Sequence, residues 1–392
     1  MGRRHNHRSG WGRPLVSLAT LALLGTGAWL LAPHSQWLLE RAALVSAAAT
    51  MPDGLWDRLA QRFAGQLEED SPANDLSLPP PSSSSQPEPD AASQPEEASL
   101  PEPEEEDSPF AALPPLPRQE APEIPPEYQA PLREVQMVGD DSGTFLPVGA
   151  GYLRNYTTLS FEEIAACIVP PEVTLPQTDE PLVLILHTHA TESFEPADAD
   201  VYDTRSGWRD TDNTNNMVRV GAELAATLEA EGIGVIHDTT QHDYPSYNGS
   251  YDRSAQTIAR VLEEYPSIQV ILDVHRDGIQ QDDGTVLKPV AEIDGKKAAQ
   301  LMIISGCDDG TVGLPNWEQN LQFAAAITDQ VEQDYPGLMR PIFFAYRKYN
   351  MDVTPCSLLL EFGSNGNTLE EACTTARLVG SSIAKVIRSM QE

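Results

Sequence analysis

The sequence predicts an α/β fold in which helices cover both faces of a mostly parallel central sheet. From residue 181 to residue 392, short apolar segments alternate with segments whose apolar residues recur at helical spacing. Such alternation is typical of strands joined by crossover helices, and it favours parallel pairing. Three apolar segments lead directly into histidine or glutamate. This places polar side chains at the carboxyl ends of strands, where open α/β sheets bind their ligands.

The predicted strands are short, apolar and rich in branched side chains. Strands of a parallel sheet covered on both faces have this composition, because neither face meets water. The predicted strands span residues 182–186, 233–236, 270–274, 301–305 and 356–362.

The predicted helices separate these strands and carry recognisable boundary signals. Gly232 supplies a left-handed stop after the first long helix, and Thr368 forms a capping box with Glu371 at the start of the last one. The apolar face of the first long helix consists of Met217, Val220, Leu224 and Leu228. The predicted helices span residues 161–168, 213–231, 254–264, 320–335 and 369–390.

The chain is strongly acidic, with 25 basic and 59 acidic residues and a net charge of −34. Phosphate recognition depends on lysine and arginine, so this balance excludes nucleic acid as a partner. The four cysteines show neither CxxC pairing nor zinc-finger spacing, and we expect buried free thiols.

Residues 1–34 are predicted to form a cytoplasmic tail and a transmembrane anchor. Four arginines precede an uncharged stretch at residues 14–33, close to the ~20 apolar residues that cross a bilayer. Basic residues before the span place the N-terminus inside. We therefore expect a single-pass protein of the cell membrane whose C-terminal domain is extracytoplasmic. A cleaved signal peptide is the alternative, with a cleavage site among the small residues at 46–49.

Residues 35–127 are predicted to form an extracellular linker rich in proline, glutamate and serine. Residues 63–117 contain no lysine or arginine, and such a composition cannot bury enough apolar surface to offset the entropy of ordering. Proline stiffens the segment and like charges extend it, which favours a spacer. A docking site for a basic partner is the alternative. Residues 128–180 are expected to be a small extension of the main domain, which spans residues 181–392.

Four residues at three strand ends form the candidate site. His187 and Glu192 follow the first strand, His275 follows the third, and Glu361 lies at the end of the last. Imidazole and carboxylate groups are zinc ligands, and zinc hydrolases use three protein ligands while leaving one position for water. The pattern indicates a metallohydrolase in which His187, Glu192 and His275 bind zinc.

Two of these ligand assignments have alternatives. His189 replaces His187 if the strand continues two residues further, since period-two spacing would point both the same way. The other histidine would then contact the substrate or support a ligand. Asp210 and Asp212, just before the first long helix, compete with Glu192 as the carboxylate ligand.

Glu361 is predicted to act as the general base, which deprotonates zinc-bound water and then protonates the leaving amine. Arg253 and Arg276 are candidates for holding a substrate carboxylate through a two-pronged hydrogen bond. A structural pairing of either arginine with one of the many acidic side chains is the alternative.

Several motifs resemble those of the stage II sporulation protein P family of endospore-forming bacteria. They span residues 187–194, 247–254, 273–277, 346–350 and 360–371. The likeness covers about residues 181–392. It implies an amidase-like zinc hydrolase domain, and a zinc-dependent N-acetylmuramoyl-L-alanine amidase with additional endopeptidase activity on peptidoglycan. It also implies action during engulfment, alongside stage II sporulation proteins D and M.

Three functions therefore compete. The preferred one is a membrane-anchored hydrolase that cuts the amide between N-acetylmuramic acid and L-alanine of the stem peptide, and so thins the septal wall. The second is a non-catalytic wall-binding scaffold on an inactive hydrolase fold, without stoichiometric zinc. The third is a zinc endopeptidase that acts mainly on peptide cross-links.

Overall fold

The computed structural model describes residues 113, 114, 116 and 121–391, all of which belong to one compact unit, Ala98–Glu392. The predicted transmembrane anchor and nearly all of the predicted linker lie outside these residues. Within the described part of the chain, no helix is both long and apolar enough to cross a membrane. The four cysteines are free, and three of them are buried.

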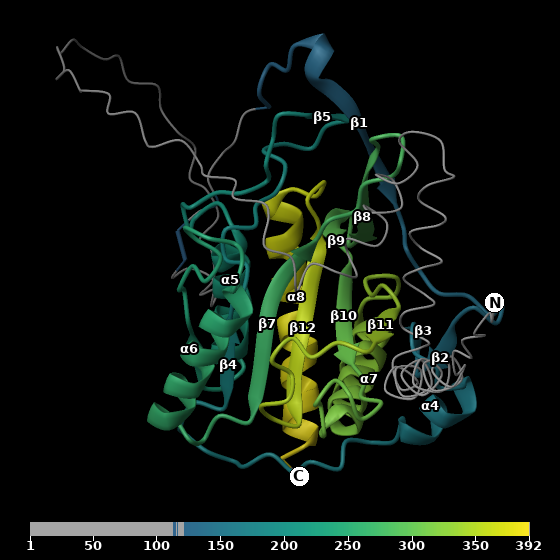
Figure 1. Ribbon diagram of the computed structural model, residues 1–392, viewed down its shortest axis with the longest axis vertical. Coiled ribbons are helices and arrows are strands. Elements are labelled where there is room, and N and C mark those ends of the chain that lie inside the picture. The colour runs from purple at the N-terminus through teal and green to yellow at the C-terminus, as the bar shows by residue number, and fades with distance from the viewer. Residues whose placement is uncertain (1–112, 115, 117–120, 392) are drawn as a thin grey trace, which may run out of the picture. The chain divides into compact units, whose positions relative to one another are not determined.

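A mixed eight-stranded sheet forms the centre of the molecule, in the order β2-β3-β11-β10-β12-β7-β4-β6 (Figure 1). Its strands are β2 (Leu146–Val148), β3 (Gly151–Asn155), β4 (Val183–Leu186), β6 (Val235–His237), β7 (Val270–Asp277), β10 (Leu301–Gly306), β11 (Ile342–Ala345) and β12 (Cys356–Ser364). The β2–β3 and β10–β12 pairs are antiparallel and the other neighbours run parallel. The α/β prediction is confirmed, with the correction that the sheet is mixed.

A smaller four-stranded sheet, in the order β5-β1-β8-β9, lies beyond one end of the central sheet. Its strands are β1 (Gln129–Val135), β5 (Val201–Asp203), β8 (Val286–Ile293) and β9 (Lys296–Ala299). Residues 128–180 supply β1 to this sheet and β2 and β3 to the central one, as well as helix α4 (Phe161–Cys167). This segment is thus built into both sheets.

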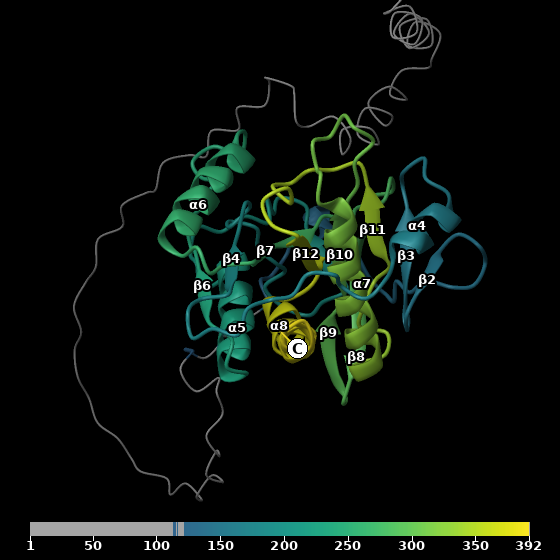
Figure 2. The same ribbon diagram turned by 90° about the horizontal axis from the view of Figure 1, so that it is seen from below.

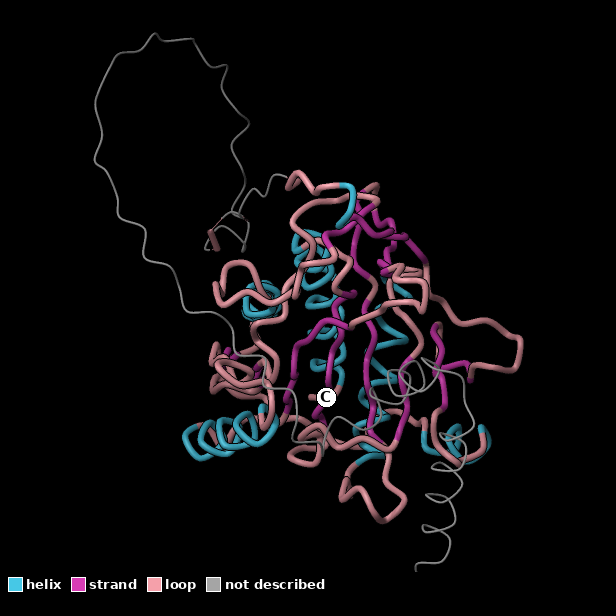
Figure 3. Tube along the Cα trace, turned by 45° about the horizontal axis from the view of Figure 1, so that its top comes forward, coloured by secondary structure: helices cyan, strands magenta, loops and turns pink. Residues whose placement is uncertain are grey.

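Helices cover both faces of the central sheet (Figure 2). They are α5 (Met217–Ala230), α6 (Ser250–Glu264), α7 (Trp317–Asp334) and α8 (Leu369–Ser389). Helix α5 ends before Gly232, whose φ is 79°, and α8 starts at the predicted capping box of Thr368 and Glu371. Figure 3 shows the strands side by side, with loops joining them to the helices at their ends.

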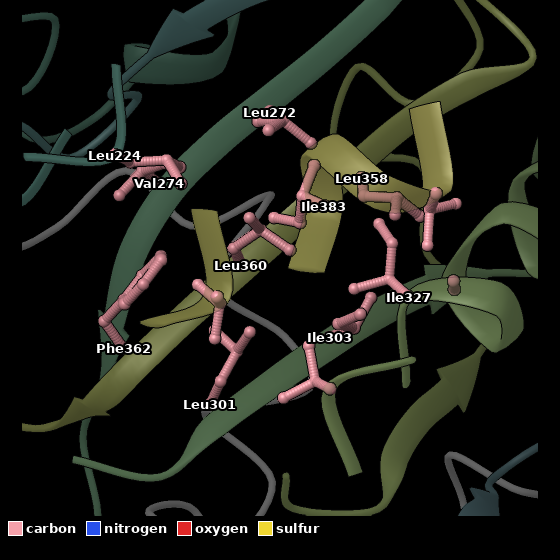
Figure 4. Close-up of a cluster of buried hydrophobic side chains, with 14 of the residues drawn as sticks. Leu224, Leu272, Val274, Leu301, Ile303, Ile327, Leu358, Leu360, Phe362 and Ile383 are labelled. Carbon is pink, nitrogen blue, oxygen red and sulfur yellow. The ribbon is translucent and has the colours of Figure 1, made fainter. Parts of the chain in front are cut away.

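Alternation along the strands gives the central sheet two distinct faces. Val270, Leu272 and Val274 of β7 belong to the large core beneath α5, α7 and α8 (Figure 4). Ile271 points the other way and packs with Ile258 of α6. We call these the α8 face and the α6 face. Each fully buried aliphatic side chain contributes roughly 1.5–3 kcal/mol to folding, so strand phase is firmly specified.

Candidate metal centre

Three ligand-type side chains converge at the carboxyl ends of β4 and β7. Nδ1 of His189 lies 3.6 Å from Oε1 of Glu192, and Nδ1 of His275 lies 3.6 Å from Oε2 of the same carboxylate. One ligand atom from each residue lies within 4.8 Å of the others, and all three residues are buried. Two imidazoles and one carboxylate are the donor set of hydrolytic zinc sites.

The local chain path brings these groups together. Strand β4 ends at Leu186, and a turn follows in which the amide of Glu192 donates to the carbonyl of His189 at 3.2 Å. The turn folds both side chains toward the α6 face. His275 reaches the same face from within β7, because it follows Val274, which belongs to the α8 face.

Each histidine has a partner for its second ring nitrogen. Nε2 of His189 lies 3.2 Å from Oγ of Ser250, and Nε2 of His275 lies 2.9 Å from Oδ1 of Asp273. The second contact is an ion-pair distance without hydrogen-bond alignment. In both histidines Nδ1 therefore points toward Glu192. A metal-ligating histidine typically has this arrangement, with one ring nitrogen for the metal and the other near an outer partner.

The electrostatics of the cluster favour positive charge. Burial opposes protonation of His275, but the carboxylates of Asp273 and Glu192 outweigh it and raise the pKa of His275 well above its usual value. Burial also disfavours ionised Glu192, yet Arg276 and the two histidines hold the pKa of Glu192 well below its usual value. A buried site that stabilises a cation between carboxylates suits a divalent metal.

His187, which the sequence favoured over His189, lies apart from this cluster. Its Nδ1–H donates to the carbonyl of Val274 at 2.9 Å, so its Nε2 accepts from Nε2–H of His237, also at 2.9 Å. Burial and the neighbouring His237 lower the pKa of His187 to about 3. The structure therefore groups His189, in place of His187, with Glu192 and His275.

The alternative carboxylate ligands also lie elsewhere. Oδ1 of Asp210 accepts the amide of Asp212, and Oδ1 of Asp212 accepts the amide of Thr214. Neither aspartate belongs to a cluster of three metal-ligand groups within the described residues. The geometry thus favours Glu192, as the sequence did.

Glu361 lies beside the cluster on the neighbouring strand. β12 and β7 are parallel, and Glu361 is in register with His275. Its Oε2 is buried without a hydrogen-bond partner. Burial, and then the charge of Asp277, raise the pKa of Glu361 to about 8. A general base works best when its pKa is near the working pH, so this carboxyl suits the predicted proton transfer.

Both arginines predicted to bind a substrate carboxylate instead donate hydrogen bonds to main-chain carbonyl groups. Nε of Arg276 donates to the carbonyl of Ser193 and its Nη2 to that of Trp208, both at 2.9 Å. Arg253 donates to the carbonyls of His242, Ser246 and Asn248. These contacts hold the loops around the cluster and favour the structural alternative for both residues.

Sequence reasoning missed Arg209. Its Nη1 donates to Oδ2 of Asp243 at 2.6 Å, and its Nη2 lies 3.7 Å from Oε1 of Glu192. Its guanidinium carbon lies 5.1 Å from the ring centre of Tyr247, which is stacked on His189 at 4.6 Å. Asp243 follows 34 positions later in the chain, so no local motif signals the pair.

A second group of carboxylates, Glu134, Asp198 and Glu371, is close enough to hold an ion, but it surrounds a lysine. Nζ of the buried Lys288 lies 2.5 Å from Asp198, 2.8 Å from Glu371 and 3.3 Å from Glu134. The ammonium group already supplies the positive charge there. This cluster ties β8 to β1 and α8 and is structural.

Comparisons with known proteins agree with the motifs. The model of the stage II sporulation protein P family matches residues 82–386. The chain is 32% identical over 217 residues to stage II sporulation protein P of Bacillus subtilis (strain 168), covering 52% of this chain and 49% of the relative. The match thus spans about half the length of that relative.

The chain also resembles solved amidase structures. The CwlD amidase of Clostridioides difficile, solved with the GerS lipoprotein, is 11% identical, with 53% of this chain and 98% of that chain covered and a TM-score of 0.32. The apo N-acetylmuramyl-L-alanine amidase Ami1 of Mycobacterium abscessus is 10% identical, with coverages of 54% and 100% and a TM-score of 0.32.

Proposed function

Because the chain belongs to the stage II sporulation protein P family, we propose that it is a zinc-dependent peptidoglycan hydrolase of sporulation. We propose in particular that it cleaves the amide between N-acetylmuramic acid and L-alanine of the stem peptide. The observation that supports this most directly is the cluster of His189, Glu192 and His275 with Glu361 beside it. The donor set fits zinc, and an unpartnered carboxyl lies where amide hydrolysis needs a base.

In this proposal Nδ1 of His189, Nδ1 of His275 and the carboxylate of Glu192 would hold zinc. When bound, zinc would supply Lewis acidity toward the amide carbonyl and toward water. Ser250 and Asp273 keep the two imidazole rings in their binding orientation. Arg276 holds the turn that carries Glu192 through its bond to the carbonyl of Ser193.

Glu361 moves the proton. Its carboxylate takes a proton from the attacking water as the new carbon–oxygen bond forms. It then gives that proton to the departing nitrogen as the carbon–nitrogen bond breaks, which releases a carboxylic acid on the sugar and an amine on L-alanine. The acid then loses its remaining proton to solvent or to the released amine. Positioned proton transfer of this kind typically contributes about 10²–10⁴-fold to the rate.

Incubation of the purified chain with peptidoglycan, followed by mass analysis of the products, tests this reaction. The proposal predicts glycan strands stripped of peptide and stems with a free L-alanine amine. Products in which every stem remains on its sugar while cross-links are cut would identify an endopeptidase. No cleavage, together with no zinc in freshly purified protein, would favour the wall-binding scaffold.

The cellular setting is part of the same proposal. The predicted anchor at residues 1–34 would hold the chain in the cell membrane with its catalytic domain outside, facing the septal wall. Family membership supports work during engulfment alongside stage II sporulation proteins D and M. Labelling from outside intact cells, with and without proteolysis, would show on which side of the membrane the C-terminal domain lies.

A further inference from the structure

The proposed substrate is anionic, whereas the candidate site is surrounded by acids. Glu192, Glu361, Asp273 and Asp277 all lie on or beside the strand ends that form the site. A peptide stem bears free carboxylates, and their approach to such a site needs a compensating cation with hydrogen-bond donors. Arginine meets this need best, because its planar guanidinium matches a carboxylate with two parallel bonds.

Three of the four arginines around the site are buried or already donate hydrogen bonds to other groups of the protein. Arg253 and Arg276 donate to main-chain carbonyls, and turning either one toward a ligand would break these hydrogen bonds. Arg340 is 8% exposed, and its Nη2 donates to Asp277 at 2.8 Å. These residues are poorly placed to receive a substrate group.

Arg209 differs from them in both access and bonding. Its side chain is 33% exposed, and its shortest contact is the hydrogen bond from Nη1 to the buried Asp243. Its other contacts are longer: Nη1 lies 3.5 Å from Oγ1 of Thr191 and Nη2 lies 3.7 Å from Oε1 of Glu192. Within the described residues no hydrogen bond from its Nε or Nη2 is present. These two nitrogens lie on one edge of the guanidinium, the edge that binds a carboxylate side-on. Thr191 also donates to Asp243, so the pair is tied to the turn that carries the metal ligands.

We propose that Arg209 binds the free α-carboxylate of the second residue of the peptide stem and thereby sets the substrate class of the site. This inference rests on the proposed amidase function. Nη2 of Arg209 lies 3.7 Å from a ligand oxygen of Glu192, so the bound carboxylate must be close to the scissile amide. The first stem residue, L-alanine, has no free carboxylate, because both its backbone groups form amides. The second residue is therefore the nearest donor of one.

Two muramoyl peptides that differ only at this group test the proposal. One carries a free α-carboxylate on the second residue and the other carries a carboxamide. For the full-length wild-type chain, we expect kcat/KM to be about 10–100-fold higher for the carboxylate, the range of a charge-assisted hydrogen bond. In Arg209→Gln this ratio should fall to about 1. Arg209→Lys should retain part of it, because the charge remains but the two-pronged geometry is lost.

Arg205→Gln is the matched control. Arg205 lies in the same loop but pairs with Asp203, outside the site. The ratio of kcat/KM values for the two peptides should therefore be the same in Arg205→Gln as in the wild type. Zinc content should be unchanged in all variants. Equal losses on both peptides in Arg209→Gln would show that Arg209 only supports the loop and would overturn the proposal. A wild-type ratio of about 1 would overturn it as well.

Calorimetric binding of the two peptides separates this inference from the proposed function. If the wild-type chain cleaves neither peptide at the muramoyl–alanine bond, the amidase proposal fails, but binding still tests Arg209. Tighter binding of the carboxylate peptide that is lost in Arg209→Gln would support the assignment. Equal affinities of the wild type for the two peptides would refute it.

Discussion

Glu361 shows how surroundings convert an ordinary carboxyl into a candidate base. Its Oε2 is buried and unpartnered, and burial with the nearby Asp277 raises its pKa to about 8. The neighbouring His275 and Arg340 pull the pKa in the opposite direction. The balance keeps the group able to accept and release a proton near neutral pH, which the two halves of amide hydrolysis both require.

Glu361→Gln should keep zinc and lose hydrolysis by about 10²–10⁴-fold, because the amide preserves shape but cannot take up a proton. Zinc content by elemental analysis and turnover on peptidoglycan measure the two effects separately. Glu370→Gln, in the exposed first turn of α8, is the matched control and should be fully active. Loss of metal in Glu361→Gln would make Glu361 a ligand.

The same residue should make the stability of the metal-free protein depend on pH. A carboxyl whose folded pKa lies above its unfolded value of 4.5 stabilises the fold below that value, and this stability is lost as pH rises through about 8. Metal-free Glu361→Gln should therefore unfold at higher denaturant concentration than the wild type at pH 8. The difference should shrink toward pH 5. A constant difference at all pH values would contradict the raised pKa.

At the scale of elements, strand phase decides which histidine faces the site. β4 pairs with β7 so that Leu186 is opposite Asp273. The same register places His187 next to Val274, on the α8 face. There His187 packs against α5, where a Cβ at Gly221 would meet its ring at 2.5 Å. The strand ends before His189, and the turn carries that residue to the α6 face.

Alanine at each histidine separates the two roles. His189→Ala should lose zinc, because one of three ligands is removed. His187→Ala should keep zinc but lose roughly 1–3 kcal/mol of stability, since the carbonyl of Val274 and the ring of His237 lose their buried partner. Metal analysis and denaturant unfolding of both variants provide the comparison. Zinc loss in His187→Ala alone would reverse the assignment.

At the scale of the molecule, the segment before residue 181 is part of the fold. β3 extends the central sheet by pairing with β11, and β1 joins the smaller sheet through β8. The amide of Leu175 donates to the carbonyl of Met390 at 2.9 Å, which fastens this segment to the end of α8. The two sheets that support the site therefore include strands from the segment before residue 181 as well as from the rest of the domain.

Truncation tests this dependence. A chain that starts at residue 181 should be poorly soluble and lack cooperative unfolding, because removal of β1 and β3 exposes the edges of β5, β8 and β11 and apolar core. A chain that starts at residue 121 should retain cooperative unfolding. Thermal scans followed by circular dichroism distinguish the two. Cooperative folding of the shorter chain would show that the extension is dispensable.

The predicted linker gives a prediction for the whole chain. Shortening residues 71–117, of which the structure describes only residues 113, 114 and 116, should leave activity on soluble peptidoglycan fragments unchanged. It should impair action on the intact wall from the membrane, because a stiff, charged spacer determines reach. Fragment turnover and septal thinning in sporulating cells are the two measurements. A large loss of turnover on fragments would show that the segment contributes to catalysis.

Local signals in the sequence were sufficient for the helices and for strands β4, β6, β7, β10 and β12, whereas strand β11 was not predicted. The last helix, predicted at 369–390, spans Leu369–Ser389, because its capping box and apolar face are contained in its own residues. The β8–β9 hairpin was missed although its turn, Asp294 and Gly295, adopts positive φ at both positions. An Asp-Gly pair between strands is a known signal for a hairpin with a two-residue turn.

The sequence by itself determined the α/β class, the acidic character and the strand ends that supply Glu192, His275 and Glu361. Each of these depends on composition or on spacing within a few residues. Only the tertiary structure decided that His189 joins them, since strand register relates residues that lie far apart in the chain. It also decided the position of Arg209, whose partner Asp243 comes from another loop. Contacts between distant segments are set by packing, which no local pattern encodes.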